Sequence, residues 1–188
     1  CGHNADAHTS QLIHCRAQTD RNRSLLQNLG QYLNYREKDV GKALLSALMC
    51  FSMGLRLSPK EYTSVRALER NCAKQISIVN DICSWEKELQ QSKSGHAEGS
   101  ALCCAVQIVA DETCLGVPAA KRLLWAMARE WSDRHDALVT RREADASGCS
   151  DAVKAYMKGL EYQMSGNEEW SLSTLRYTAL PPDEDERL

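Results

Sequence analysis

Long apolar runs are missing from this chain of 188 residues: none approaches the roughly 20 residues that a helix needs to cross a bilayer. No signal-peptide pattern opens the sequence either. A surplus of positive charge is also missing, since 23 Lys and Arg residues stand against 25 Asp and Glu residues. Because affinity for a phosphate backbone requires a basic surface, this balance disfavours a nucleic-acid partner. We therefore expect a cytoplasmic protein with no membrane span.

Cysteine is plentiful, but the spacings that would give it a dedicated role are absent. The nine cysteines include no Cys-x-x-Cys pair, and none stands at a zinc-site spacing from a histidine. This pattern disfavours both a disulfide framework and a zinc centre. We expect reduced thiols that serve as small apolar side chains in the core.

Alternating runs of β-branched residues are scarce, whereas apolar residues recur at helical spacing along nearly the whole chain. The sequence therefore predicts an all-α fold, with residues 1–177 in one domain and a polar, disordered tail at 178–188. The segment Val40–Leu55 is apolar over most of its circumference, which predicts a buried central helix. Ser58 and Ser150 stand where helix N-caps are expected. The expected helices cover approximately residues 12–35, 40–55, 59–91, 100–111, 116–142 and 151–164.

Near the middle of the chain, one helical stripe combines polar groups that suit a metal ion. At 100° per residue, Ser84 lies about 40° and Glu88 about 80° from Asn80, and Lys87 lies about 20° to the other side. An amide oxygen, a hydroxyl and a carboxylate suit a hard cation such as Mg²⁺, which takes further ligands from water and substrate phosphates. Lys87 would add positive charge for a phosphate. The same stripe is also typical of a solvated polar face, and the wheel does not exclude Asp81.

The amino-acid sequence around this stripe resembles a known family motif. Residues 80–88 read Asn-Asp-Ile-Cys-Ser-Trp-Glu-Lys-Glu, which is similar to the motif (Asn/Asp)-Asp-(Leu/Ile/Val)-x-(Ser/Thr)-x-x-x-Glu of class I terpene synthases. The resemblance implies that Asn80, Ser84 and Glu88 bind one Mg²⁺ of a three-metal cluster. It also implies that Lys87 contacts the substrate diphosphate.

Two further segments resemble the same family, in the same order along the chain. Residues 170–177 contain Trp170 and the pair Arg176-Tyr177. The resemblance implies that this pair hydrogen-bonds the diphosphate and that Trp170 and Tyr177 have catalytic roles. Upstream, Arg36 resembles the diphosphate-sensing Arg of the family. Guanidinium groups suit phosphate because they stay charged and bind in bidentate geometry, and an indole face attracts cations.

Over residues 15–177 the amino-acid sequence resembles that of fungal aristolochene synthases. The resemblance implies a class I terpenoid synthase α-helical bundle. It also implies a sesquiterpene cyclase that ionises farnesyl diphosphate with Mg²⁺ and cyclises the carbocation to a hydrocarbon such as aristolochene. It leaves room for a homo-oligomer. The residues that carry the site are then expected to face one cavity: Arg36, Asn80, Ser84, Lys87 and Glu88.

One part of the family pattern does not occur in these 188 residues: the Asp-Asp-x-x-(Asp/Glu) motif that binds the other two metals. We therefore expect a bundle truncated on its N-terminal side, an incomplete metal cluster and no turnover by this chain alone. Two alternatives stay open. The chain could be an inactive helical remnant or non-catalytic module. With less support from its Asn/Ser/Glu motif, it could instead belong to a prenyl chain-elongating transferase.

Overall fold

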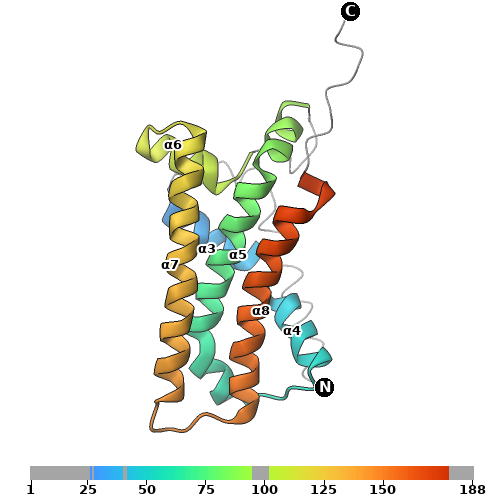
Figure 1. Cartoon of the computed structure of the whole chain (residues 1–188), viewed down its shortest axis with the longest axis vertical. Coiled ribbons are helices and arrows are strands. Elements are labelled where there is room, and N and C mark those ends of the chain that lie inside the picture. The colour runs from blue at the N-terminus through green and yellow to red at the C-terminus, as the bar shows by residue number, and fades with distance from the viewer. Residues whose placement is uncertain (1–25, 27, 40–41, 95–101, 178–188) are drawn as a thin grey trace, which may run out of the picture.

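The computed structural model describes residues 26, 28–39, 42–94 and 102–177, and every regular element in this part is helical (Figure 1). The all-α prediction is confirmed. The helix start predicted at residue 12 and the tail predicted at 178–188 lie outside the described residues. Among the described helices, none combines the length and the apolarity that a membrane crossing requires. The elements are α3 (Leu29–Asp39), α4 (Lys42–Ser52), α5 (Pro59–Ser94), α6 (Ala105–Thr113), α7 (Val117–Glu143), α8 (Asp151–Ser173) and the 3₁₀ turn η1 (Leu175–Tyr177).

The longest helix, α5, lies between α7 and α8 and packs along both of them (Figure 1). Its N-terminal half, from Val65 to Ile76, is buried in an apolar cluster shared with α4 and α8. Its next turns, from Ile78 to Trp85, are buried in a second cluster shared with α3, α6 and α7. The segment that carries the predicted metal motif is therefore held from several sides.

The starts of α5 and α8 are tied together at the end of the bundle opposite the motif. Ser58 and Glu61 form a capping box, in which the Glu61 amide donates to Ser58 Oγ at 3.3 Å and the Ser58 amide donates to Glu61 Oε2 at 2.8 Å. Ser150 caps α8 by accepting from the Val153 amide, and its hydroxyl donates to Glu61 Oε1 at 2.6 Å. Both N-caps expected from the sequence are confirmed.

The prediction of a buried central helix at Val40–Leu55 is wrong. The observed α4 lies at the edge of the bundle, and Leu44, Leu48 and Phe51 are 65%, 53% and 88% exposed. Within the described chain α4 contacts α3 and α8, and Met49 packs it into the apolar cluster of α5 and α8. An all-round apolar pattern shows that burial would be favourable, but it does not show that a covering element is present.

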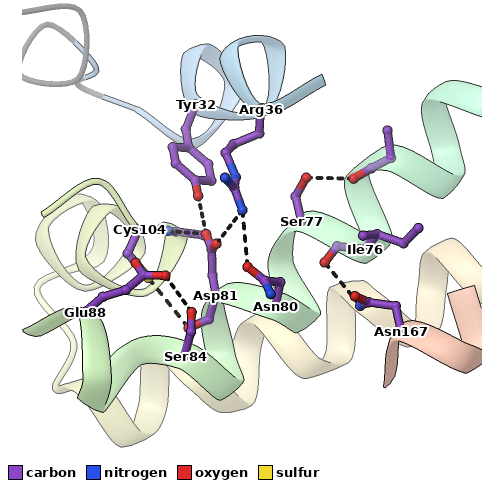
Figure 2. A network of polar contacts seen from close by, with 12 residues as sticks. Tyr32, Arg36, Ile76, Ser77, Asn80, Asp81, Ser84, Glu88, Cys104 and Asn167 are labelled. Atoms are coloured by element: carbon purple, nitrogen blue, oxygen red, sulfur yellow. Dashed lines mark hydrogen bonds and ion pairs between the residues drawn. The ribbon is translucent and has the colours of Figure 1, made fainter. Parts of the chain in front are cut away.

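The helix α8 continues to Ser173, well past the end predicted at Met164. Residues 165–167, which read Ser-Gly-Asn, have low intrinsic helix propensity. A tertiary contact supports the helix there, since Asn167 Nδ2 donates to the Ile76 carbonyl of α5 at 3.4 Å (Figure 2). The extension carries the chain up to the motif segment of α5.

Candidate metal and diphosphate site

A cleft of about 570 Å³ lies beside the C-terminal half of α5. The four motif residues Asn80, Ser84, Lys87 and Glu88 all line it, because residues three and four apart share one face of a helix. The structure thus brings together the residues that the sequence placed on one stripe. The remaining lining residues come from four elements: Leu45 from α4, Gln91 from α5, Trp170 from α8, and Arg176 and Tyr177 from η1.

Ser84 and Glu88 form the core of the stripe, one helical turn apart. Ser84 Oγ donates to Glu88 Oε1 at 2.6 Å (Figure 2), which turns the carboxylate toward the hydroxyl. Burial and, after it, the nearby Asp81 carboxylate raise the pKa of Glu88. A cation in the cleft would offset both effects, so the site favours cation binding.

Arg36 is the exception among the five residues expected to face one cavity, because it does not line the cleft. It reaches the site through Asn80 instead: its Nη2 donates to Asn80 Oδ1 at 3.4 Å and to Asp81 Oδ1 at 3.2 Å (Figure 2). The Arg36 side chain is 17% exposed and forms an ion pair with Asp81. Its positive charge therefore lies next to the motif rather than within the described cleft wall.

Asp81 lies next to Asn80, and the sequence pattern assigned it no role. It is 1% exposed and does not line the cleft. Its Oδ2 accepts from the Tyr32 hydroxyl of α3 and from the Ala105 amide, at 2.8 Å, at the start of α6. Its place in the motif, next to Asn80, was the only available signal, since its partners lie far away in the sequence.

The C-terminal segment folds back over the stripe. The helix α8 ends at Ser173, and Tyr177 then accepts a hydrogen bond from Asn80 Nδ2 at 2.6 Å. The rings of Trp170 and Tyr177 meet edge to face, with centroids 5.5 Å apart and planes at 80°. Arg176 lies beside them and is exposed. The predicted Arg-Tyr pair and the predicted metal motif are therefore neighbours in space.

The donor set of the stripe suits a hard divalent cation that shares an anionic ligand. An amide oxygen, a hydroxyl and a single carboxylate carry one negative charge between them, so a divalent ion would also need ligands such as phosphate oxygens. Within the described ranges, no group of three or more His, Cys, Asp or Glu residues could hold a metal. The described cysteines are free thiols: Cys50, Cys72, Cys83, Cys103, Cys104, Cys114 and Cys149.

Comparisons with known proteins agree with this geometry. The family model "Terpene synthase family 2, C-terminal metal binding" matches residues 7–134. An aristolochene synthase of Penicillium roqueforti is 62% identical over 166 residues, which cover 88% of this chain and 48% of that protein. An aristolochene synthase of Aspergillus terreus is 56% identical over 169 residues, covering 90% of this chain and 52% of that protein.

The fold comparison gives the same result. The crystal structure of aristolochene synthase from Penicillium roqueforti matches with a TM-score of 0.71 and 59% identity, over 79% of this chain and 48% of that one. The chain thus spans about half the length of the relatives that it matches. With the family model covering most of its residues, and with the motif on one cleft, the chain belongs to terpene synthase family 2, in which it corresponds to the C-terminal metal-binding region.

Proposed function

We propose that the protein carrying this chain is a sesquiterpene cyclase, which ionises farnesyl diphosphate and cyclises the carbocation to a hydrocarbon such as aristolochene. The observation that carries the proposal is the single cleft on which Asn80, Ser84 and Glu88 lie together with Lys87 and Arg176. One wall presents oxygen ligands, and cationic side chains from two different elements stand at the same opening. Relatives named aristolochene synthase, 56–62% identical to this chain, support the choice of reaction.

Asn80, Ser84 and Glu88 would hold one Mg²⁺ through the amide oxygen, the hydroxyl and the carboxylate. When bound, the ion would stabilise negative charge on the leaving diphosphate as a Lewis acid. Glu88 supplies the only formal negative charge among the three residues. The Ser84 hydroxyl orients Glu88 by donating to its Oε1, so the carboxylate does not need to be reoriented when a cation arrives.

Lys87, Arg176 and Tyr177 would bind the diphosphate. Lys87 projects from α5 and Arg176 from η1, so the two charges reach the cleft from separate elements. Burial raises the pKa of Tyr177, so its hydroxyl stays protonated at neutral pH. Because this hydroxyl accepts its hydrogen bond from Asn80, its own proton stays directed elsewhere and can be donated to a phosphate oxygen. Arg36 would add charge from behind Asn80.

Apolar and aromatic groups complete the cleft. Leu45 of α4 and Trp170 of α8 line it beside the polar stripe. An indole face attracts a cation, which suits Trp170 to a carbocation close to the leaving group.

The direct test incubates the full-length gene product with farnesyl diphosphate and Mg²⁺ and analyses the products by gas chromatography and mass spectrometry. We expect a cyclic C15 hydrocarbon that disappears when the metal is chelated. A longer linear diphosphate would instead identify a prenyl chain-elongating transferase. A folded protein that leaves the substrate intact would identify a non-catalytic module.

A further inference from the structure

The Asp81 carboxylate, next to the site, accepts hydrogen bonds from three protein groups. Its Oδ1 accepts from Arg36 Nη2 at 3.2 Å, while its Oδ2 accepts from the Tyr32 hydroxyl and from the Ala105 amide at 2.8 Å (Figure 2). The residue is 1% exposed. A buried carboxylate is stable in its charged form only when it is paired and hydrogen-bonded, and these three donors meet that need within the protein.

The three donors to Asp81 come from two other helices. Tyr32 and Arg36 stand one turn apart on α3, so they project from the same face of that helix. Ala105 is the first residue of α6, whose amide has no partner within its own helix. One carboxylate on α5 therefore fixes the position of α3 and of the start of α6. The thiol of Cys104 adds a weak contact to the Asp81 carbonyl at 3.6 Å.

This arrangement determines where the Arg36 charge lies. The Nη2 atom that donates to Asp81 also reaches Asn80 Oδ1 at 3.4 Å. The guanidinium is thus held against the first residue of the metal motif before any substrate binds. A charge that is already in place requires no reorganisation when an anion arrives, which makes its contribution to binding larger.

We propose that Asp81 is a positioning residue for Arg36, whose positive charge lies behind Asn80 at the diphosphate site, and that it is not a ligand of the metal. The inference rests on the proposed function, because it assigns Asp81 a part in binding the same substrate. Two observations separate it from the motif ligands: Asp81 does not line the cleft that Asn80, Ser84 and Glu88 share, and both of its oxygens accept bonds from protein groups.

The test is a double-mutant cycle in the full-length protein, with Asp81→Asn, Arg36→Ala and the combined variant. Two quantities are measured: the KM for farnesyl diphosphate, and the Kd for inorganic diphosphate in the presence of Mg²⁺. In the protein that retains Arg36, we expect Asp81→Asn to raise the KM and the Kd by roughly tenfold, the range found for directly coupled residues. In the Arg36→Ala background the same change should alter them by less than about twofold. An equal effect in both backgrounds would show that Asp81 acts independently of Arg36 and would overturn the proposal.

The metal dependence separates positioning from ligation. Glu88→Gln should raise the Mg²⁺ concentration needed for half-maximal activity, because it removes the carboxylate of the proposed ligand set. Asp81→Asn should leave that concentration within about twofold, because all three proposed oxygen ligands stay in place. An equal rise in both variants would make Asp81 a metal ligand and would refute the inference.

Two further variants keep the test decisive if Asp81→Asn fails to fold. Tyr32→Phe removes one donor to the carboxylate while keeping the buried ring, and we expect it to raise the KM by roughly two- to fivefold, again only when Arg36 is present. Ser77→Ala is the matched control: it removes a buried hydroxyl on α5 that bonds the Ala73 carbonyl (Figure 2), and its KM should equal that of the wild type. A Tyr32→Phe effect that persists without Arg36, or that Ser77→Ala reproduces, contradicts the proposal.

The failure of this inference differs from the failure of the proposed function. A wild-type protein that forms no hydrocarbon would overturn both. A wild-type protein that forms hydrocarbon, with no coupling between Asp81 and Arg36, would overturn this inference alone.

Discussion

The Asn80 carboxamide is held from two sides: its Nδ2 donates to the Tyr177 hydroxyl at 2.6 Å, and its Oδ1 accepts from Arg36 Nη2 at 3.4 Å. Tyr177 stands 97 positions away in the sequence, so this bond joins the metal motif to the C-terminal part of the predicted site. These two bonds fix the orientation of the Asn80 amide, with its nitrogen toward Tyr177 and its oxygen toward the positive charge of Arg36. Loss of either partner would leave the amide free to rotate.

Removing the Tyr177 hydroxyl tests this arrangement. We expect Tyr177→Phe to lower kcat/KM for farnesyl diphosphate by roughly two- to tenfold, the effect of one or two lost hydrogen bonds. Steady-state kinetics on the full-length protein measures it. Leu175→Ala, a change at an 87% exposed residue of the same turn, is the control and should leave the kinetics unchanged. A Tyr177→Phe variant with wild-type kinetics would exclude a role for the hydroxyl.

Glu88→Gln should have opposite effects on metal binding and on metal-free stability. In the folded protein the pKa of Glu88 is raised by burial and then by Asp81, so the folded state holds this proton more tightly than the unfolded chain does. Stability is therefore lost as the pH rises through the raised pKa, and at neutral pH the ionised Glu88 destabilises the metal-free fold. We expect the variant to melt at a higher temperature without metal and to gain less from added Mg²⁺.

Thermal melts with and without Mg²⁺ measure both effects. Glu86→Gln is the matched control on the same helix, because Glu86 pairs with Lys121 at 2.7 Å and does not line the cleft. It should gain as much stability from Mg²⁺ as the wild type. Equal Mg²⁺ stabilisation of Glu88→Gln and the wild type would remove Glu88 from the ligand set.

His135 should make the fold sensitive to mild acid. It is 1% exposed on α7, and burial lowers its pKa. The unfolded chain therefore binds this proton more readily, and stability falls as the pH drops below the ordinary histidine value of about 6.5. The slope is at most about 1.4 kcal/mol for each pH unit, the value for one proton. Urea unfolding between pH 7.5 and 5.5 measures it, and His135→Leu should flatten this part of the profile. An unchanged slope in that variant would assign the sensitivity to another group.

Gly159 allows α8 to approach α4 closely. A Cβ at this position would lie 2.2 Å from Met49 Sδ, so an added methyl group must displace the methionine. We expect Gly159→Ala to destabilise the protein by about 1–3 kcal/mol, as overpacking does, and Met49→Ala to relieve part of the loss in the double variant. Gly166→Ala is the control on the same helix: its Cβ would meet nothing within 4 Å, and it should stabilise by roughly 0.5–1 kcal/mol. Chemical unfolding measures all four variants.

Two parts of the site could be predicted from the sequence: the stripe set by local periodicity, and the segment 170–177 marked by its resemblance to the family. Asn80, Ser84, Lys87 and Glu88 share a face because a helix places them there, and a single helix carries them all. The contacts of Asp81 could not be predicted, since they depend on how α3 and the start of α6 pack against α5. Their partners are distant in the chain, and no local pattern marks them.

The errors in the fold have the same origin. The residues of α4 are apolar on several sides, but whether Leu44 or Phe51 is buried depends on a neighbouring element rather than on its own helix. The helix α8 continues past Met164 although Gly166 and Asn167 have low helix propensity. The hydrogen bond from Asn167 to Ile76 compensates for that weakness, and it exists only in the packed bundle.

The helix α5 is one continuous rod of 36 residues that is buried in both apolar clusters. Backbone amides exchange with solvent through openings of cooperative units, so the amides from Ile76 to Ile78, where the clusters meet, should exchange only when both clusters open at once. The metal motif begins within a turn of that point. The geometry of the motif should therefore persist for as long as the folded state does. A disruptive substitution deep in either cluster should shorten the lifetime of the motif and the lifetime of the fold together.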